Sequence, residues 1–315
     1  MSEKKVLLSG VKPTGRPHIG NYFGAMRQFV DLQDKYGSLI FVADYHAITT
    51  LHDPEVLRKN VRGVMLDYLA IGLDPKKTTL YRQSDISEHT ELAWIFNSIT
   101  TMPFLMRAHA FKDAEAKNKE LSVGTFDYPM LMAADILLYE PDVVPVGQDQ
   151  KQHIEIARDT AEKFNRLFGA TFKLPKALIR EEVATVPGTD GQKMSKSYNN
   201  TIPLFASRDE ITKAVMGIVT DSSGELPANV YAIHKLLVPE SELAGVYESF
   251  KGKYKDIKER LVEDLDSLIK PIREKRKELD ATDGLVEEVL EKGGAVAKKL
   301  ASAKMETVRK AIGVR

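Results

Sequence analysis

Short apolar runs and amphipathic stretches alternate through the first part of the chain. Apolar runs bounded by turn residues predict buried strands at Lys5 to Ser9, Leu39 to Ala43 and Thr79 to Gln83. Between them, apolar positions from Ile19 onward recur at helical spacing, and Pro54 to Ile71 predicts a helix with Asp53 as its N-cap. Strands that alternate with helices in this way predict a parallel sheet covered by helices.

The middle of the chain continues this alternation, whereas the last third does not. Asp142 to Val146 predicts a strand, and helices are predicted at Glu88 to Thr100, Tyr128 to Tyr139 and Gln150 to Phe168. From about residue 205 strand signals vanish. Helical patterns then cover Asp209 to Val219, Val230 to Leu237, Ser241 to Phe250, Tyr254 to Leu279 and Gly284 to Ile312.

These patterns predict the fold class and its division into domains. We expect a Rossmann-like, doubly wound parallel sheet in a catalytic domain of residues 1–204. A helical domain of residues 205–315 follows, and its last helix is long enough to pack back on the catalytic domain.

Composition narrows the class of protein. The 315 residues are 43% hydrophobic and 29% charged, which is typical of a globular chain. Because the formal net charge is zero, a nucleic-acid partner would have to meet a local basic patch. The absence of cysteine excludes disulfides, thiolate catalysis and cysteine-ligated metals. No signal peptide or membrane-spanning run stands out, so we expect a cytoplasmic protein.

The first candidate motif runs from Lys12 to Asn21, between the first strand and the first helix. Ligands of open parallel sheets bind at such strand-to-helix turns, and a helix N-terminus attracts phosphate. Gly20 lets a flat group approach the backbone, while His18 and Asn21 can donate to phosphate or ribose oxygens. Taken alone, the motif is also compatible with an ordinary glycine-rich loop, because such turns with a histidine occur often.

The second candidate motif is Lys193 to Ser197, in a loop that also contains glycines. Lysines at a spacing of three could hold a polyphosphate and neutralise the charge of a departing pyrophosphate. The competing interpretation is a solvated basic loop. Neither motif matches the Walker A pattern of phosphate-binding loops. Together, however, the two motifs predict an ATP site.

The combination of His18-Ile19-Gly20-Asn21 with Lys193 to Ser197 resembles the paired signature of class I aminoacyl-tRNA synthetases. Within that class the chain resembles the bacterial tryptophanyl-tRNA synthetase family along most of its length. The matching stretches are Gly10 to Ala25, Val42 to Thr49, Tyr128 to Tyr139, Val144 to His153 with Arg158-Asp159, Lys193 to Ser197, Gly217 to Ser223 and Gly293 to Gly313.

The chain departs from the family pattern at two places. The general class motif ends in a second histidine where this chain has Asn21, as the tryptophan group commonly does. The family often has Gln-Pro-Ser where this chain has Lys12-Pro13-Thr14. Thr14 keeps a hydroxyl for ATP, but the resemblance assigns no role to the charge of Lys12.

The resemblance implies an ATP site made from both motifs. His18, Thr14, Lys193 and Lys196 are its implied catalytic residues, with Thr14 and His18 facing the phosphates and the lysines holding pyrophosphate. Gly20 and Asn21 would face adenine and ribose. The remaining implied contacts are Lys12, Pro13, Met194, Ser195, Ser197, the ribose-side residues Gly147, Gln148 and Asp149, and an adenine contact near Val183.

The resemblance also implies a tryptophan pocket around Asp135. A buried indole N–H needs an acceptor, and a carboxylate inside an apolar helix is costly to bury unless it is paired. Asp135 could equally be an ordinary acid on a helix surface. The other implied contacts are Tyr128, Met132 and Leu8 around the ring, and Gln150 and His46 near the ammonium and carboxylate. Met132 could instead be plain core, and His46 a structural histidine.

The function implied is activation of L-tryptophan by ATP and transfer of the acyl group to tRNA(Trp). Mg²⁺ would accompany ATP, since the sequence shows no dedicated metal site. A homodimer is implied, with the apolar helix Glu88 to Met106 either at its interface or in the core. The alternatives are a tyrosine-specific synthetase, a non-catalytic paralogue that binds tRNA or tryptophan, and another adenylating ligase on the same fold.

Overall fold

A parallel sheet forms the centre of the computed structural model, which describes residues 4–108, 111–112, 121–145, 151–178, 186–220 and 226–314. Strands β1 (Val6–Val11), β2 (Gly37–Val42) and β3 (Thr78–Arg82) pair in parallel. Strand β4 (Val144–Pro145) pairs with β5 (Ala177–Leu178), and a parallel bridge between Leu7 and Val143 joins the two sets. The strand order is therefore β3-β2-β1-β4-β5.

This order confirms the predicted doubly wound sheet. The described strands are all parallel, but the chain adds β2 and β3 on one side of β1 and adds β4 and β5 on the other side. The order of the strands therefore switches direction between β1 and β4. In such sheets, ligands bind at the carboxyl ends of the strands that flank this switch point. A strand was predicted at Asp142 to Val146. Within the described residues the observed strand is shorter, since β4 spans only Val144–Pro145. Strand β5 was not predicted from the sequence.

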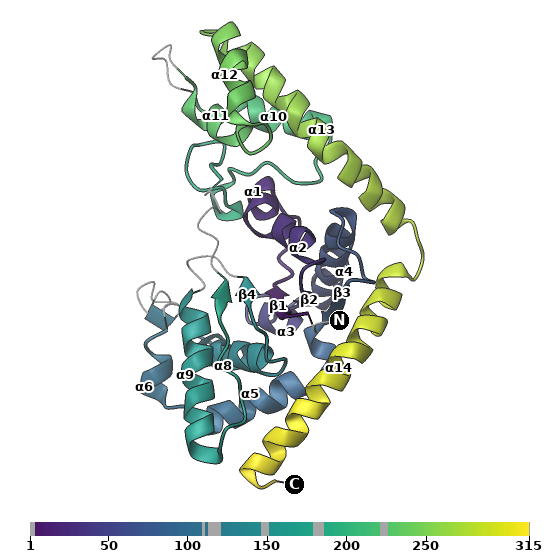
Figure 1. Ribbon diagram of the computed structural model, residues 1–315. Helices are drawn as coiled ribbons and strands as arrows, with labels where there is room; N and C mark the ends of the chain where they lie inside the picture. Colours follow the sequence, from purple (N-terminus) through teal and green to yellow (C-terminus); the bar gives the residue numbers. More distant parts are fainter. Residues whose placement is uncertain are drawn as a thin grey trace.

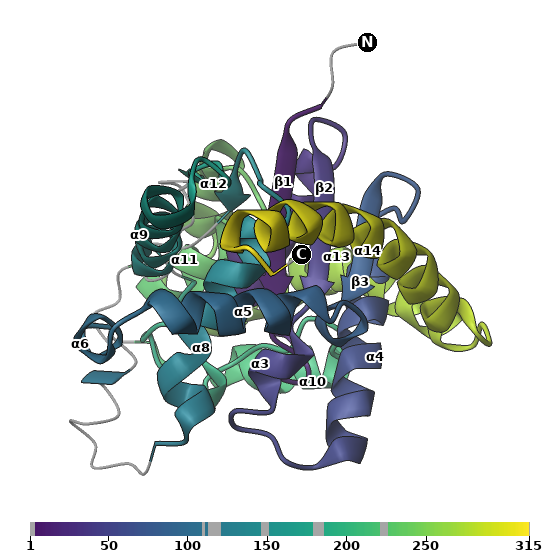
Figure 2. The same cartoon turned by 90° about the horizontal axis from the view of Figure 1, so that it is seen from below.

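Helices cover both faces of the sheet. On β2, Ile40 and Val42 belong to an apolar cluster with α2 (Arg27–Leu32) and α4 (Pro54–Ala70). Leu39 and Phe41 belong to a second cluster on the opposite face. The helices of that second face are α5 (Glu88–Ile99), α8 (Val123–Leu137) and α9 (Lys151–Phe168). The view from below shows β1, β2 and β3 side by side (Figure 2).

The first predicted helix is divided into three segments. It consists of α1 (Ile19–Asn21), the π-helical segment η1 (Tyr22–Met26) and α2. The apolar spacing correctly predicted a helix here, and Met26 and Phe29 are buried. A π turn holds one more residue than an α turn, so it rotates the side chains that follow it.

The C-terminal part is helical. It contains α10 (Arg208–Met216), α11 (Ala228–His234), α12 (Glu240–Ser249), α13 (Tyr254–Asp280) and α14 (Leu285–Ile312). Figure 1 shows α10 to α13 grouped above the sheet, with α13 leading down to α14. One apolar cluster continues from α2 and α4 through Ile202 and Leu204 into α10 and α13. The predicted division after residue 204 therefore lies within a stretch that packs on both parts.

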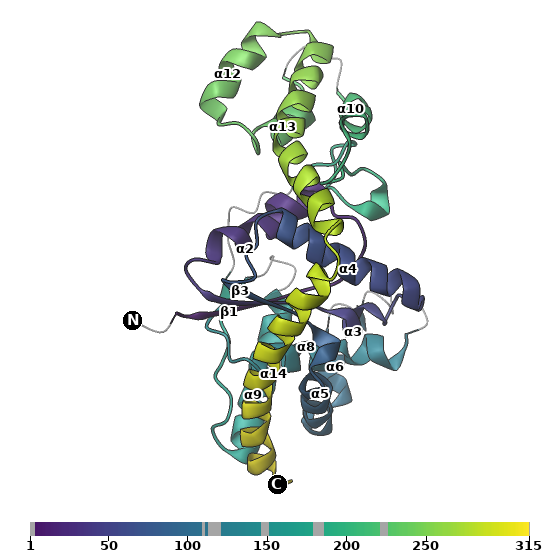
Figure 3. The same cartoon turned by 90° about the vertical axis from the view of Figure 1, so that its right-hand side faces the viewer.

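Helix α14 runs back along the part that contains the sheet and packs against β3 and α5, as Figure 3 shows from the side. Its small residues allow close approach: a Cβ on Gly293 would overlap the backbone carbonyl of Leu80 in β3. Lys298 pairs with the buried Glu88 of α5 at 2.6 Å, and Arg309 pairs with Glu91 at 2.5 Å. The edge of the sheet is thus covered by the last helix of the chain.

Shorter helical segments connect these elements. They are α3 (Asp44–Ala47), η2 (Gln83–Asp85), α6 (Met102–Leu105) and η4 (Lys196–Tyr198). Within the described ranges, no helix is both long and apolar enough to cross a membrane.

Candidate active site

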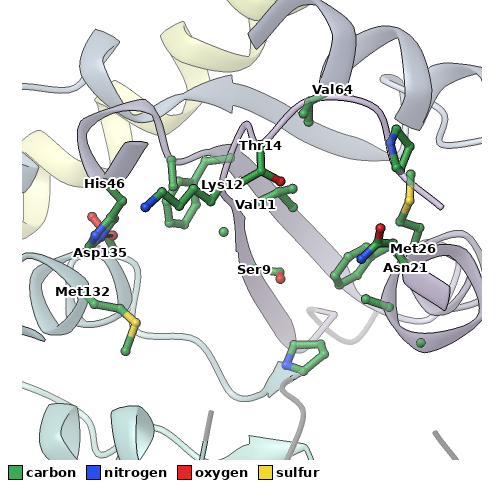
Figure 4. A pocket seen from close by; sticks show the side chains of 18 of the residues that line it. Ser9, Val11, Lys12, Thr14, Asn21, Met26, His46, Val64, Met132 and Asp135 are labelled. Atoms are coloured by element: carbon green, nitrogen blue, oxygen red, sulfur yellow. Dashed lines mark hydrogen bonds and ion pairs between the residues drawn. The ribbon is translucent and has the colours of Figure 1, made fainter. Parts of the chain in front are cut away.

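A cavity of about 880 Å³ opens at the carboxyl end of β1, beside the switch point of the sheet. Figure 4 shows residues from β1, the loop after it, α3 and α8 around this cavity. Its lining includes most of the predicted residues that the structure describes: Leu8, Lys12, Thr14, His18, Asn21, His46, Tyr128, Met132, Asp135, Ser195 and Lys196. Two motifs more than 170 positions apart in the chain therefore meet at one site.

Other predicted residues lie outside the lining. Lys193 is exposed, and its carbonyl accepts a hydrogen bond from Asn200. Met194 is buried and packs in the core. Pro13, Gly20 and Ser197 flank lining residues without joining them. Predicted contacts at Gly147, Gln148, Asp149, Gln150 and Val183 lie outside the described residues.

Hydrogen bonds join the two motifs to each other. Lys196 Nζ donates to the carbonyls of Thr14 at 3.0 Å and Gly15 at 3.2 Å. Behind this contact, the Ile19 N–H donates to the Ile202 carbonyl, and the Leu204 N–H donates to the Pro17 carbonyl. The late loop is therefore held against the early one. Burial lowers the pKa of Lys196, while the attraction of Asp67 opposes this change.

His18 caps the N-terminus of α1 through a reciprocal pair of hydrogen bonds with Asn21. The His18 N–H donates to Asn21 Oδ1 at 3.0 Å, and the Asn21 N–H donates to His18 Nδ1 at 3.3 Å. Burial and the nearby Lys196 charge lower the pKa of His18 to about 4. The imidazole is therefore neutral near pH 7, and because Nδ1 accepts, its proton is on Nε2. His18 can offer one neutral donor to an oxygen in the cavity.

Gly20 is required by close packing. A Cβ at this position would lie 2.8 Å from His18 Nδ1 and 3.4 Å from the Met194 Cβ. Any larger residue would push the His18 ring away from its cap or displace Met194. Gly20 does not line the cavity, but the small size of glycine lets His18 and Met194 keep their positions beside it.

Asp135 lies at the opposite end of the cavity and is fully buried in α8. His46 Nε2 lies 3.0 Å from Oδ2, and the His46 side chain is 13% exposed on the cavity side. Burial by itself would raise the pKa of Asp135, but hydrogen bonds and positive charge from His46 and His89 lower it to about 2. The carboxylate is therefore ionised near pH 7 and can only accept hydrogen bonds.

Two partners of Asp135 were not predicted from the sequence. Gln83 Nε2 donates to both carboxylate oxygens, at 2.8 and 3.0 Å, and His89 Nδ1 donates to Oδ1 at 2.6 Å. His89 Nε2 in turn lies 3.0 Å from the Tyr139 hydroxyl. Both Gln83 and His89 are fully buried. A polar residue at the carboxyl end of a strand is a signal for Gln83, but no local pattern marks His89.

Aromatic and thioether groups surround the acceptor. The rings of Tyr128 and His46 meet edge-on with centroids 6.1 Å apart. Met132 and Leu8 also line this end of the cavity. This end combines an apolar wall with one ionised acceptor, which suits a flat aromatic group that carries a single N–H.

Comparison with known proteins identifies the family. The family model of class I tRNA synthetases for tryptophan and tyrosine matches residues 2–286. The chain belongs to this family of class I aminoacyl-tRNA synthetases. The tryptophan–tRNA ligase of Fusobacterium nucleatum subsp. nucleatum is 46% identical to this synthetase, over 98% of this chain and 97% of that protein.

Two further relatives of this synthetase show the same similarity. The tryptophan–tRNA ligase of Rhodopirellula baltica is 46% identical over 98% of this chain and 99% of that protein. A solved structure of tryptophanyl-tRNA synthetase from Campylobacter jejuni, complexed with ADP and tryptophan, superposes with a TM-score of 0.92. It is 44% identical and covers 98% of this chain and 99% of that one.

Proposed function

We propose that this synthetase is a tryptophan–tRNA ligase, which joins L-tryptophan to tRNA(Trp) at the expense of ATP. The observation that carries the proposal is the buried, ionised Asp135 carboxylate at the apolar end of the cavity. An indole N–H can only donate, so it needs an acceptor of this kind. The relatives reported above carry this activity in their names.

Asp135 also accounts for amino-acid selection. A pocket built to bond a substrate group rejects analogues that lack this group by roughly 10⁴-fold or more, whereas size alone gives roughly 10–200-fold. Phenylalanine has no donor and would leave the carboxylate without its ligand partner. Tyr128, Met132 and Leu8 are the proposed wall of the ring pocket, and His46 is proposed on its open side, beside Asp135.

The opposite end of the cavity is the proposed ATP site. A tryptophan carboxylate oxygen attacks the α-phosphorus, the new O–P bond forms, and the bond to the bridging oxygen breaks. Pyrophosphate leaves with that electron pair, which gives tryptophanyl-adenylate. Neutral His18 Nε2–H and the Thr14 hydroxyl are proposed donors to phosphate oxygens, and Lys196 is a proposed cation for the leaving group. Lys193 is proposed to join it when ATP is bound.

ATP is proposed to arrive with Mg²⁺, which would neutralise phosphate charge. Among the described residues, no group of three or more His, Cys, Asp or Glu is arranged to hold a metal ion. We therefore assign no protein ligand to the metal. Asn21 is proposed on the ribose side because it lines the cavity next to His18.

In the second step, a hydroxyl of the terminal tRNA adenosine, proposed to be the 2′-hydroxyl, attacks the carbonyl carbon of the adenylate. AMP leaves, and the hydroxyl proton passes to its phosphate or to water. The helical part, α10 to α13, is the proposed anticodon-binding domain. Many charges on α13 pair within the helix, such as Lys255 with Glu259 and Arg260 with Asp264. These pairs partly cancel the positive potential that α13 would otherwise present to tRNA. This reaction is proposed to take place in the cytoplasm.

A homodimer is proposed from an exposed apolar surface. Trp94 of α5 is 73% exposed, Met102 at the start of α6 62%, and Val123 at the start of α8 81%. Helices α5 and α6 both contact α8. Large apolar side chains that stay exposed on neighbouring elements favour burial against a partner. Sedimentation of the wild-type protein beside Trp94→Glu tests this surface, since the added charge should release monomers.

Tryptophan-dependent exchange of pyrophosphate with ATP tests the activation step. We expect exchange with tryptophan and none above background with tyrosine or phenylalanine. Asp135→Asn should lower kcat/KM for tryptophan at least about a hundredfold, because the amide is a poorer acceptor and disturbs its three donors. Charging of tRNA(Trp) then tests the transfer step.

Asp127→Asn is the matched control for this experiment. Asp127 lies on the same helix, is half-buried, and accepts from Asn97 at 2.7 Å outside the cavity lining. Its replacement should leave exchange within about threefold of wild type. Exchange driven by tyrosine would refute the choice of amino acid, and no exchange with any amino acid would refute the activity.

A further inference from the structure

Lys12 is the first residue after β1, at the switch point of the sheet, and the ATP contact implied for it above does not explain its positive charge. Its side chain extends from the end of β1 into the cavity toward His46 and Asp135 (Figure 4). The family pattern stated above often has an uncharged glutamine here. This chain therefore has a positive charge in the cavity where the family often has an uncharged side chain.

The Lys12 ammonium forms no ion pair with any described residue. Among the residues that the structure describes, it makes one hydrogen bond, a long one of 3.5 Å from Nζ to Thr49 Oγ1. By contrast, Lys196 holds two backbone carbonyls. Lys12 as a whole is exposed, but its partial burial beside the cavity lowers the pKa of the ammonium. A cation that faces a cavity without an acidic partner favours an anionic ligand.

Two chains of contacts place this cation between the ends of the cavity. On one side, Thr49 donates to the His46 carbonyl at 2.8 Å, and the His46 ring lies 3.0 Å from Asp135. On the other side, Lys12 is two residues from Thr14, whose carbonyl binds Lys196. Lys12 therefore lies where the amino-acid end and the phosphate end meet.

The proposed reaction has an electrostatic difficulty at this point. A carboxylate must approach an α-phosphate, although both are negatively charged and repel each other as they come into contact. Where the walls of the cavity replace part of the surrounding water, this repulsion is stronger than in bulk water. A fixed cation at the junction lowers the energy of that encounter and of the five-coordinate transition state, over which the charge spreads.

We propose that Lys12 is a catalytic residue of tryptophan activation: its ammonium contacts both the tryptophan carboxylate and the α-phosphate of ATP, and it offsets their mutual repulsion. This role rests on the proposed function. It differs from that of Lys196, which holds the two loops together and faces the leaving group. Lys12 acts on the two groups that form the new bond.

Lys12→Met tests the role, because it removes the charge and keeps most of the apolar stem. We expect kcat of tryptophan-dependent pyrophosphate exchange to fall about ten- to hundredfold. The Kd of tryptophan should rise several-fold, while the Kd of tryptamine, which has no carboxylate, should stay within about twofold. Lys12→Arg, which keeps the charge, should recover a large part of the lost rate, and Lys12→Gln should lie between Met and Arg.

Lys76→Met is the matched control, since Lys76 is exposed on the turn before β3, away from the cavity. It should leave every constant unchanged. An unchanged kcat in Lys12→Met, with normal wild-type exchange, would overturn the role of Lys12 alone. Equal weakening of tryptamine and tryptophan would also overturn it, because the change would then reflect a damaged pocket. No exchange by the wild-type protein would overturn the proposed function and this role together.

Discussion

The Asp135 carboxylate already accepts hydrogen bonds at about as many positions as its lone pairs provide. Gln83 contacts both oxygens, His89 contacts Oδ1 and His46 contacts Oδ2. A carboxylate offers roughly four acceptor positions. An indole N–H therefore has to take the place of one donor, and His46 is the partner on the cavity side. We expect tryptophan to displace His46 from Oδ2, while Gln83 and His89 keep the carboxylate in place.

Gln83→Met tests this support at the residue scale. Without the amide, the carboxylate loses a donor to each oxygen, so its pKa rises and its position loosens. We expect kcat/KM for tryptophan to fall about ten- to hundredfold. The preference for tryptophan over 3-benzothienylalanine, in which sulfur replaces the N–H, should shrink by a similar factor. Steady-state pyrophosphate exchange with both amino acids measures this ratio.

Gln33→Met is the control for the same substitution. Gln33 is also buried, and it bonds the Gly72 carbonyl and the Asp74 N–H away from the cavity. Its loss should lower stability without changing the preference. A preference that falls equally in both variants would show that Gln83 acts through general stability.

His18 gives a pH-dependent prediction. Its pKa is about 4 in the folded chain and about 6.5 when unfolded, so the unfolded state takes up a proton first as pH falls. The stability contributed by neutral His18 is complete above pH 6.5 and is lost between pH 6.5 and 4. Relative to His18→Gln, the wild-type protein should lose about 2 kcal/mol between pH 7 and 4.5. Urea unfolding at both pH values measures this, and His52→Gln, at an exposed histidine, should show no such change.

The sequence predicted the residues of the site unevenly. Asp135, His46 and Lys196 belong to contiguous motifs, and the structure brings them to one cavity. Gln83 and His89 belong to none, because the identity of a carboxylate's partners depends on which strand end and helix face lie opposite it. That information is tertiary, and neither periodicity nor composition contains it.

At the scale of elements, hydrophobic periodicity predicted the long helices to within a few residues. Helix α4 was expected at Pro54 to Ile71 and spans Pro54–Ala70. The failures have physical reasons. The π turn of η1 adds one residue to the turn, but apolar residues on both sides of it are still buried, so the apolar spacing alone does not reveal it. Strand β5 is two residues long, which is too short for any period to show.

The packing of α14 on β3 gives a prediction at this scale. Because a Cβ on Gly293 would overlap the Leu80 carbonyl, Gly293→Ala must push the helix away from the strand. We expect a loss of about 3 kcal/mol in the free energy of unfolding, at the upper end of the range for overpacking. Gly245→Ala in α12 is the opposite control, because open space surrounds that position. Gly245→Ala should stabilise the protein by about 0.5–1 kcal/mol. Guanidinium unfolding of both variants and of the wild-type protein measures the two changes.

At the scale of the whole molecule, an ion pair with a buried carboxylate joins α4, which covers the sheet, to the helical part. Arg276 of α13 donates to Asp67 of α4 at 2.5 Å, and the guanidinium lies over the Phe205 ring at 5.3 Å. Burial raises the pKa of Asp67 to about 6, against the opposing pull of Arg276 and Lys196. Asp67 also lines the cavity. The position of α13 and the charge next to the late loop are thus linked through Asp67.

Arg276→Met should destabilise the protein by about 3–5 kcal/mol at pH 8, because it leaves a buried carboxylate unpaired. At pH 5 the loss should be smaller. A raised pKa favours folding at low pH, and this contribution is lost as pH rises through about 6. The double variant Asp67→Asn/Arg276→Met should recover much of the stability, as guanidinium unfolding at pH 5 and 8 can show.

Arg62→Met is the surface counterpart of that change. Arg62 pairs with Asp280 at 2.6 Å and also joins α4 to the end of α13, but both groups are exposed. Its loss should cost no more than about 1 kcal/mol at either pH. Similar losses for the two arginines would contradict the importance of the buried pair.

The cover that α14 forms over β3 also has a consequence for synthesis of the chain. Proteins emerge from the ribosome N-terminus first, at about 5–20 residues per second. The sheet residues are therefore available for on the order of ten seconds before α14 exists. During that interval β3 has an open edge, which can pair with another nascent chain on the same message. Slow translation of the last third of the gene should therefore increase aggregation, even though the finished protein keeps this edge covered.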